Sequence, residues 1–328
     1  MTELTYRAAV AEGIAREMDR DPSVVLIGED VGAAGGVFKL TEGLFARFGD
    51  KRVRDTPISE QAIVGAAMGA AMTGLRPIAE LMFSDFFAVT WDMVINQIAK
   101  ARYMTDGQVS IPIVLQTANG SGLRFGAQHS QSVENWAMAI PGLKVVAPST
   151  PSDVVGTMVA SIRSDDPVIF CGSKSLFATK GDVPDGDHVV PLGQAAIVRA
   201  GSDCTIVALA AMVPRAVEAA GRLQADHGID PEVIDLRSLV PLDVATILGS
   251  VAKTSRLFTV EENPRLLGWG AEIVSIVADE GFWSLDAPIG RITTPHIPLP
   301  SAAGLEDLAV PGVDRIVDTV RRRMEAAK

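Results

Sequence analysis

The chain has 328 residues, of which 48% are hydrophobic and 21% are charged, and its formal net charge at pH 7 is −11. This composition is typical of a globular protein with two domains, and an acidic chain with no Lys/Arg cluster beyond Arg321–Arg323 is unsuited to binding nucleic acid. The amino terminus shows no signal peptide, and no apolar run reaches the roughly 18 residues of a membrane span. The two cysteines lie far apart and suggest neither disulfides nor a zinc site. We therefore expect a cytoplasmic protein.

Short apolar runs alternate with helical patterns through the first half of the chain. Apolar residues at helical spacing predict a helix from Thr5 to Arg20, and Val24–Ile27 is typical of a buried parallel strand. Further strands are predicted at residues 76–82, 111–117, 143–148 and 167–171, and further helices at 41–48, 62–72, 86–102 and 152–164. The alternation predicts an α/β fold with a mostly parallel sheet covered by helices on both faces.

A polar stretch rich in Gly and Pro, Gly181–Gly193, interrupts this pattern and predicts a linker. The α/β alternation then resumes. Strands are predicted at residues 204–211, 231–235, 257–260 and 289–293, the last at a sheet edge, and helices at 215–228, 243–253 and 272–280. We therefore predict a first domain at residues 1–180, a linker at 181–193, and a smaller α/β domain at 194–328.

The stretch Asp55–Phe87 contains one acid, Glu60, at the start of an otherwise apolar helix. Ser59 or Thr56 is placed to cap this helix by accepting hydrogen bonds from its free amides. Glu60 is either a solvated partner of the helix dipole or a carboxyl group whose pKa is raised by apolar neighbours. The small residues from Gly65 to Gly69 would let another backbone approach closely, within this domain or from a second subunit.

Histidine is scarce, and His129 is the candidate for proton transfer. It follows the glycine-rich loop Gly120–Gly126, and its neighbours Gln128 and Ser130 can fix the orientation of the ring. The alternative is a hydrogen-bonded structural histidine. The loop also has some likeness to a dinucleotide-binding fingerprint, but its glycine spacing is one residue too long, which leaves an NAD-dependent oxidoreductase as a weak alternative.

Five motifs, in order along the chain, resemble a known family. They are Gly28–Asp30, Asp55–Glu60, Gly74–Pro77, Gln128–Gln131 and Pro141–Val146. These motifs are similar to those of the beta subunit of the thiamine diphosphate-dependent component of 2-oxo acid dehydrogenase complexes, and the resemblance covers essentially the whole chain. It implies a transketolase-like architecture, in which the first domain binds the pyrimidine end of the cofactor and the second completes the assembly.

The resemblance also implies roles for residues around Glu60. Glu60 would hydrogen-bond N1′ of the aminopyrimidine and promote the imino tautomer that removes the thiazolium C2 proton. A carboxyl group kept protonated by desolvation could donate such a hydrogen bond. Phe86 would stack on the pyrimidine, and the backbone of Ile58 would contact it.

Other roles implied by the resemblance concern proton movement and assembly. His129 would face the thiazolium and the substrate and would handle protons during decarboxylation or acyl transfer. Glu29 and Asp92 would belong to an acidic, water-filled path that joins paired active sites. The helix at Gly65–Gly69 matches the glycine motif of the family's subunit interface.

Some relatives hold a potassium ion near Ile113, and Ser161, Ser164 and Asp166 fall at matching places here. The run from Arg163 to Pro167 departs from the family's usual acid-Asn pattern.

The chain lacks the Gly-Asp-Gly segment through which thiamine enzymes bind magnesium and the diphosphate. The resemblance therefore implies an alpha subunit that holds this end of the cofactor, in an α2β2 heterotetramer. A lipoyl-bearing acyltransferase would be a further partner. Within the family, Asp92, Arg102–Met104 and Asp166–Cys171 are most similar to acetoin dehydrogenase beta subunits. We predict pyruvate or acetoin as the substrate, with a branched-chain 2-oxo acid as the alternative.

Overall fold

The computed structural model describes residues 1–326, and their contacts divide the chain into two units. The first unit comprises Met1–Asn119 and Trp136–Leu192. The second comprises Gly120–Asn135 and the chain from Gly193 onward. The break after Leu192 falls at the end of the predicted linker. The segment Gly120–Asn135, which carries His129, groups with the second unit although it lies within the sequence of the first.

The apolar runs of the first unit form a parallel sheet with the strand order β6-β7-β5-β4-β2-β3. The strands are β2 (Val24–Gly28), β3 (Val53–Asp55), β4 (Arg76–Phe83), β5 (Val114–Asn119), β6 (Lys144–Val146) and β7 (Val168–Ser173). Every residue of β5 and β7 is buried, which agrees with the mainly apolar start of each strand. A separate antiparallel pair joins β1 (Thr2–Thr5) to β8 (Lys180–Val183), so the predicted linker begins inside a strand.

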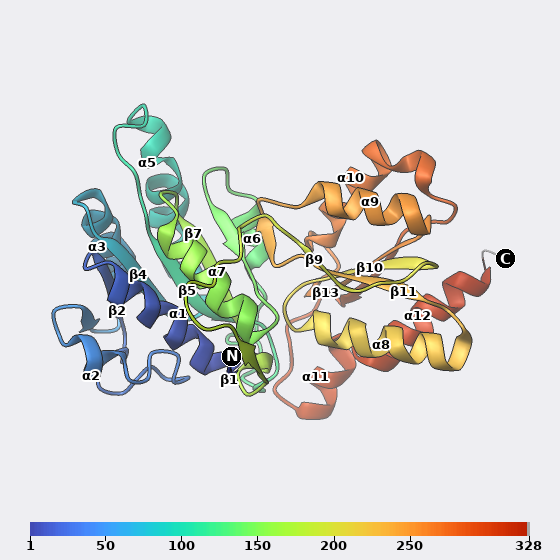
Figure 1. Ribbon diagram of the computed structural model, residues 1–328, viewed down its shortest axis with the longest axis horizontal. Coiled ribbons are helices and arrows are strands. Elements are labelled where there is room, and N and C mark those ends of the chain that lie inside the picture. The colour runs from blue at the N-terminus through green and yellow to red at the C-terminus, as the bar shows by residue number, and fades with distance from the viewer. Residues whose placement is uncertain (327–328) are drawn as a thin grey trace. The chain divides into compact units, whose positions relative to one another are not determined.

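The helices before residue 193 include those predicted from the sequence and two short ones that were not predicted, at Glu134–Met138 and Lys174–Leu176. They are α1 (Tyr6–Arg20), α2 (Leu44–Phe48), α3 (Glu60–Met72), η1 (Ser84–Phe86), α4 (Phe87–Asp92), η2 (Met93–Ile98), α5 (Ala99–Met104), α6 (Glu134–Met138), α7 (Pro151–Arg163) and η3 (Lys174–Leu176). Figure 1 shows α1 and α7 side by side, and Gly13 allows this because an added Cβ would lie 3.0 Å from Met158. The helix predicted at residues 86–102 runs without a break from Phe87 to Met104, and its middle part, η2, is a π-helix.

The second unit has its own sheet, with the order β14-β13-β10-β11-β9. Its strands are β9 (Ala196–Arg199), β10 (Cys204–Ala208), β11 (Pro231–Asp235), β13 (Leu257–Pro264) and β14 (Gly290–Thr294), and a short strand β12 spans Ser238–Val240. All pairs in this sheet are parallel except β9 with β11, and β14 is the predicted edge strand. The α/β fold predicted from the sequence is therefore confirmed in both units.

Helices cover both faces of the second sheet. They are α8 (Met212–His227), α9 (Val244–Thr254), α10 (Gly270–Glu280), η4 (Phe282–Ser284), α11 (Ala303–Ala309) and α12 (Val313–Ala326). In Figure 1, α8 and α12 lie on one side of these strands and α9 and α10 lie on the other. Each of the four thus buries an apolar stripe against the sheet.

Within residues 1–326, no helix combines the length and the apolar character that crossing a membrane requires. Cys171 and Cys204 are both free and buried, so neither forms a disulfide, and burial raises the pKa of the Cys204 thiol to about 12.

Candidate functional site

Two acids meet where β2 ends and α3 begins. Glu29 directly follows β2 and is buried, and Glu60 is the first residue of α3 and is half-buried. Burial raises the pKa of Glu29, the carboxylates of Glu60 and Asp30 raise it further, and a hydrogen bond from the Ser59 amide lowers it. The Oε1 atom of Glu29 is buried and has no hydrogen-bond partner. This pair of acids can therefore hold a proton and still has a polar atom available to a ligand.

The start of α3 differs from the sequence prediction. The Ser59 hydroxyl donates to the Pro57 carbonyl oxygen at 2.9 Å, the Thr56 hydroxyl is buried without a partner, and no side chain caps the helix. The predicted cap is therefore wrong, because the Ser59 hydroxyl is turned back to Pro57, while the Ser59 amide donates to Glu29. The amides of the first turn remain open, and their partial positive charge favours an anionic or polar group beside Glu60.

The other predicted residues of the first unit lie at the ends of neighbouring elements. Phe86 ends η1 and is half-buried, with its ring edge-on to Phe83 at 5.6 Å between centroids. Ile58 is 82% exposed. Asp92 ends α4, is exposed, and accepts a hydrogen bond from Asn96 at 2.6 Å. Within the described residues, no hydrogen bond joins Asp92 to the Glu29–Glu60 pair.

The loop that carries His129 is held by acids of the second unit. Its Gly122 amide donates to Glu306 at 3.0 Å, and Arg124 pairs with Glu306 at 2.8 Å and with Asp307 at 2.7 Å. His129 is half-buried, and its amide donates to the Gly126 carbonyl oxygen at 3.3 Å. These contacts explain why Gly120–Asn135 belongs to the second unit.

The sequence Glu261-Glu262-Asn263 fixes the same loop from β13. Glu262 accepts a hydrogen bond from the Ser121 amide, and Asn263 donates to the Ser132 carbonyl oxygen at 3.1 Å and to Asn135 at 3.0 Å. Gly120 adopts φ 81°, and an added Cβ would lie 2.7 Å from the Glu262 carboxylate. Carboxylates of the protein occupy the Ser121 and Gly122 amides, which a pyrophosphate would need, and this argues against the dinucleotide-binding alternative.

Glu80 is a buried acid near the Glu29–Glu60 pair to which the sequence prediction assigned no role. Glu80 lies in β4, between Gly28 of β2 and Gln116 of β5, and its Oε2 accepts a hydrogen bond from the Gln116 amide at 3.1 Å. Burial raises the pKa of Glu80 to about 8. The signal in the sequence was an acid inside an apolar strand, between Ala79 and Leu81.

The side chains predicted to bind a potassium ion form hydrogen bonds and ion pairs with other groups of the protein. Ser161 donates to the Thr157 carbonyl oxygen at 2.6 Å. The Ser164 hydroxyl accepts from Lys144 at 3.0 Å, and the Asp166 carboxylate pairs with Lys144 at 3.1 Å and with Arg102 at 2.5 Å. The Ile113 carbonyl oxygen accepts from the Val168 amide at 2.9 Å. These side chains do not fit a potassium ion, because cationic groups of the chain already neutralise Asp166.

Comparison with known proteins gives a consistent result over the whole chain. Residues 2–180 match the transketolase pyrimidine binding domain family, and residues 193–316 match the transketolase C-terminal domain family. The chain is 46% identical to the acetoin:2,6-dichlorophenolindophenol oxidoreductase subunit beta of Cupriavidus necator, over 99% of both chains. It is 45% identical to the pyruvate dehydrogenase E1 component subunit beta of Rickettsia conorii, over 98% of both chains.

Among solved structures, the fold is similar to a split gene transketolase described as an inactive beta4 tetramer. The TM-score is 0.82 with 21% sequence identity, and the match covers 99% of this chain and 100% of that one. At this level of identity the likeness concerns the fold alone.

Proposed function

Because this chain belongs to the family of beta subunits of thiamine diphosphate-dependent pyruvate and acetoin oxidoreductases, with a transketolase pyrimidine-binding domain and a transketolase C-terminal domain, we propose that it forms half of the active site of such an enzyme. The observation that carries the proposal is the pair Glu29 and Glu60, at the end of a parallel strand and the start of an uncapped helix. Sites in open α/β sheets gather at such strand ends.

The residues present fit the pyrimidine end of thiamine diphosphate. When bound, the cofactor supplies a carbanion at its thiazolium ring that attacks a carbonyl group. Protonated Glu60 would donate a hydrogen bond to N1′ of the aminopyrimidine, and the half-buried ring of Phe86 would stack on the pyrimidine. The exposed backbone at Ile58 would contact the ring edge. Glu60 is only half-buried in this chain, so we propose that the partner subunit completes the exclusion of water around it.

Glu29 is the group best suited to exchange a proton with Glu60. It is buried, it interacts electrostatically with Glu60, and its buried Oε1 atom has no hydrogen-bond partner and can accept a hydrogen bond. We retain Asp92 as a more distant member of an acidic proton path. Its exposure would let it face a second acidic surface in the assembly.

His129 is proposed to act on the substrate side. The acids Glu262 and Glu306 hold its loop, and the loop amides bound to them cannot move freely. A histidine on such a fixed loop can present one ring nitrogen at a constant position, as proton transfer requires.

The diphosphate end of the cofactor is proposed to bind an alpha subunit, together with magnesium. Within residues 1–326, no group of three His, Cys, Asp or Glu side chains could hold a metal ion. The relatives are named as beta subunits, which supports an alpha partner, and we propose an α2β2 assembly of the two chains. We further propose a lipoyl-bearing acyltransferase as the acceptor of the acyl group and the cytoplasm as the location. No potassium-dependent step enters the proposal.

The test of this function is reconstitution with an alpha subunit. Turnover should require both chains and thiamine diphosphate, measured as reduction of an artificial acceptor with pyruvate, acetoin and branched-chain 2-oxo acids in parallel. We propose pyruvate or acetoin as substrate, in line with the relatives, and keep the branched-chain acids as the alternative. Cofactor-dependent turnover by this chain alone would contradict the shared site.

The exposed small-residue face of α3 is proposed as the subunit contact, and Gly69→Leu tests it. An added Cβ at Gly69 meets nothing within 4 Å, so the folded chain should tolerate leucine and gain up to about 0.8 kcal/mol of helix propensity. A leucine would, however, prevent the close approach of another backbone. We expect the assembly to dissociate in sedimentation velocity while thermal unfolding of the isolated chain stays the same or improves.

The matched control is Gly221→Leu, because Gly221 lies in α8 and also has open space around its Cβ position. An assembled Gly69→Leu protein would show that α3 is not the contact.

A further inference from the structure

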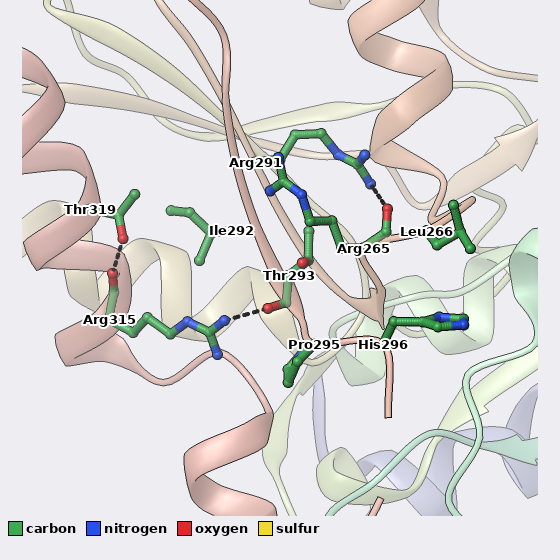
Figure 2. Close-up of a pocket in the computed structure, with 9 residues that line it drawn as sticks. All are labelled: Arg265, Leu266, Arg291, Ile292, Thr293, Pro295, His296, Arg315 and Thr319. Atoms are coloured by element: carbon green, nitrogen blue, oxygen red, sulfur yellow. Dashed lines mark hydrogen bonds between the residues drawn. The ribbon is translucent and has the colours of Figure 1, made fainter. Parts of the chain in front are cut away.

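A basic pocket in the second unit has no role in the function proposed above. It is a cavity of about 730 Å³ between the loop after β13, the strand β14 and the helix α12. Three arginines and a histidine line it, namely Arg265, Arg291, Arg315 and His296, and Leu266 and Ile292 supply apolar surface (Figure 2). This volume suits a small organic ligand.

Among residues 1–326, Arg291 is the one arginine of the three that pairs with an acid. Arg291 pairs with the buried Glu261 at 2.6 Å and also donates to the Arg265 carbonyl oxygen at 3.0 Å. Arg315 donates to the carbonyl oxygens of Thr293 and Ala309, at 2.6 and 2.9 Å, and Figure 2 shows it reaching toward Thr293. Backbone carbonyls orient a guanidinium but do not cancel its charge.

Arg265 is the most available of these groups. In the part of the chain that the structure describes, its guanidinium takes part in no hydrogen bond or ion pair, and the side chain is exposed at the pocket. Burial raises the pKa of Glu261, and the charge of Arg265 partly offsets this effect, but Glu261 is already paired with Arg291. Arg265 and Arg315 therefore place two uncompensated positive charges at one cavity.

This arrangement contrasts with the rest of the molecule. The chain has 40 acidic and 29 basic residues, and most of its arginines pair with an acid, for example Arg124 with Glu306 and Arg163 with Glu17. A basic cavity in an acidic protein concentrates positive potential at one place. Guanidinium groups bind phosphate and carboxylate groups through paired hydrogen bonds.

We propose that this pocket binds a small organic or inorganic anion that carries two or more negative charges on phosphate or carboxylate groups. Arg265 and Arg315 would contact the charged groups, and Leu266 and Ile292 would contact an apolar part of the ligand. The proposal does not depend on thiamine diphosphate or on the Glu29–Glu60 pair.

The probes are citrate for carboxylates and inorganic pyrophosphate for phosphates, titrated by calorimetry at constant ionic strength set with sodium chloride. The protein is the full chain, alone and assembled with an alpha subunit. We expect saturable binding that Arg265→Gln weakens by at least about tenfold, since each hydrogen bond to a charged group contributes roughly 1.5–3 kcal/mol. The Arg265 side chain makes no hydrogen bond or ion pair with the described residues, so this variant should fold normally.

Arg323→Gln is the matched control, because Arg323 lies on the same helix as Arg315 but outside this pocket. It should bind the probes as the unmodified chain does. The proposal is overturned if neither probe saturates, or if Arg265→Gln and Arg323→Gln weaken binding equally. Binding that disappears on assembly would also overturn it, because a partner subunit would then cover the pocket. Preference for one probe would identify the ligand as a phosphate or a carboxylate.

Discussion

The Glu60→Gln variant, assembled with an alpha subunit, is expected to lose turnover by about 10²- to 10⁴-fold, which is the range of a general acid–base contribution. The amide has the size of the carboxyl group but cannot pass a proton to N1′ of the aminopyrimidine. Glu60 makes no hydrogen bond that holds α3 to the sheet in the described residues, so the assembly should remain intact. The measurements are kcat with the preferred substrate and sedimentation velocity on the same sample.

A second readout separates this role from a structural one. Because the carboxylate of Glu60 contributes to raising the pKa of Glu29, its removal should lower that pKa and shift the acidic limb of any remaining pH profile toward lower pH. Glu42→Gln is the control, since Glu42 is exposed and distant in sequence from the site. Activity within about twofold of the unmodified enzyme would remove Glu60 from the mechanism.

The Glu80→Gln variant is expected to be more stable than the unmodified chain at alkaline pH. Glu80 has a pKa of 4.5 as a free side chain and about 8 in the folded chain, where burial disfavours its charged form. Between these values the folded chain keeps a proton that the unfolded chain releases. The free energy of unfolding therefore falls as pH rises from 4.5 to about 8, by at most about 5 kcal/mol at roughly 1.4 kcal/mol per pKa unit.

A glutamine at this position stays neutral at every pH, and its carbonyl oxygen can still accept the hydrogen bond from Gln116. The variant should lack this part of the pH dependence. Urea unfolding at pH 6 and pH 9 measures it, as the difference between the two proteins at each pH. Glu29 and Glu261 also have raised pKa values, and comparison of the two proteins cancels their contributions. If the free energy of unfolding depends on pH in the same way in both proteins, Glu80 is not a buried neutral acid.

The two predictions concern different consequences of the same local structure. β2 and β4 are adjacent parallel strands, so Gly28 and Glu80 face each other, and Glu29 follows at the strand end. Glu80 lies inside the sheet, where it can affect stability. Glu29 and Glu60 lie at its edge, where they can meet a ligand. The position of an acid relative to the strand end thus decides whether it can serve chemistry or only stability.

The sequence by itself predicted much of the fold. The apolar runs at Val24–Ile27 and residues 167–171 became buried parallel strands because both faces of a sheet covered by helices must be apolar. The helix from Thr5 to Arg20 begins at Thr5, whose hydroxyl caps it, and ends at Asp21 before Pro22. These features depend on neighbouring residues, so the order of residues is enough to reveal them.

The candidate site was only partly visible in the sequence. The local sequence pattern predicted that Glu60 lies at a helix start. It did not predict the interaction of Glu60 with Glu29 or the absence of a cap at Ser59. Each depends on groups from two elements that only the folded chain brings together. The roles of Ile58, Phe86, Asp92 and His129 came from resemblance to a family, and no local pattern would have assigned them.

Long-range contacts decided the rest. The amides of the glycine-rich loop resembled a phosphate cradle until the structure showed carboxylates from Glu262 and Glu306 bound to them, more than a hundred residues along the chain. The uncompensated charges of Arg265 and Arg315 likewise arise only where β13, β14 and α12 meet. Sequence patterns report the burial and backbone preference of nearby residues, whereas hydrogen bonding, charge balance and pKa depend on distant residues that tertiary packing brings together.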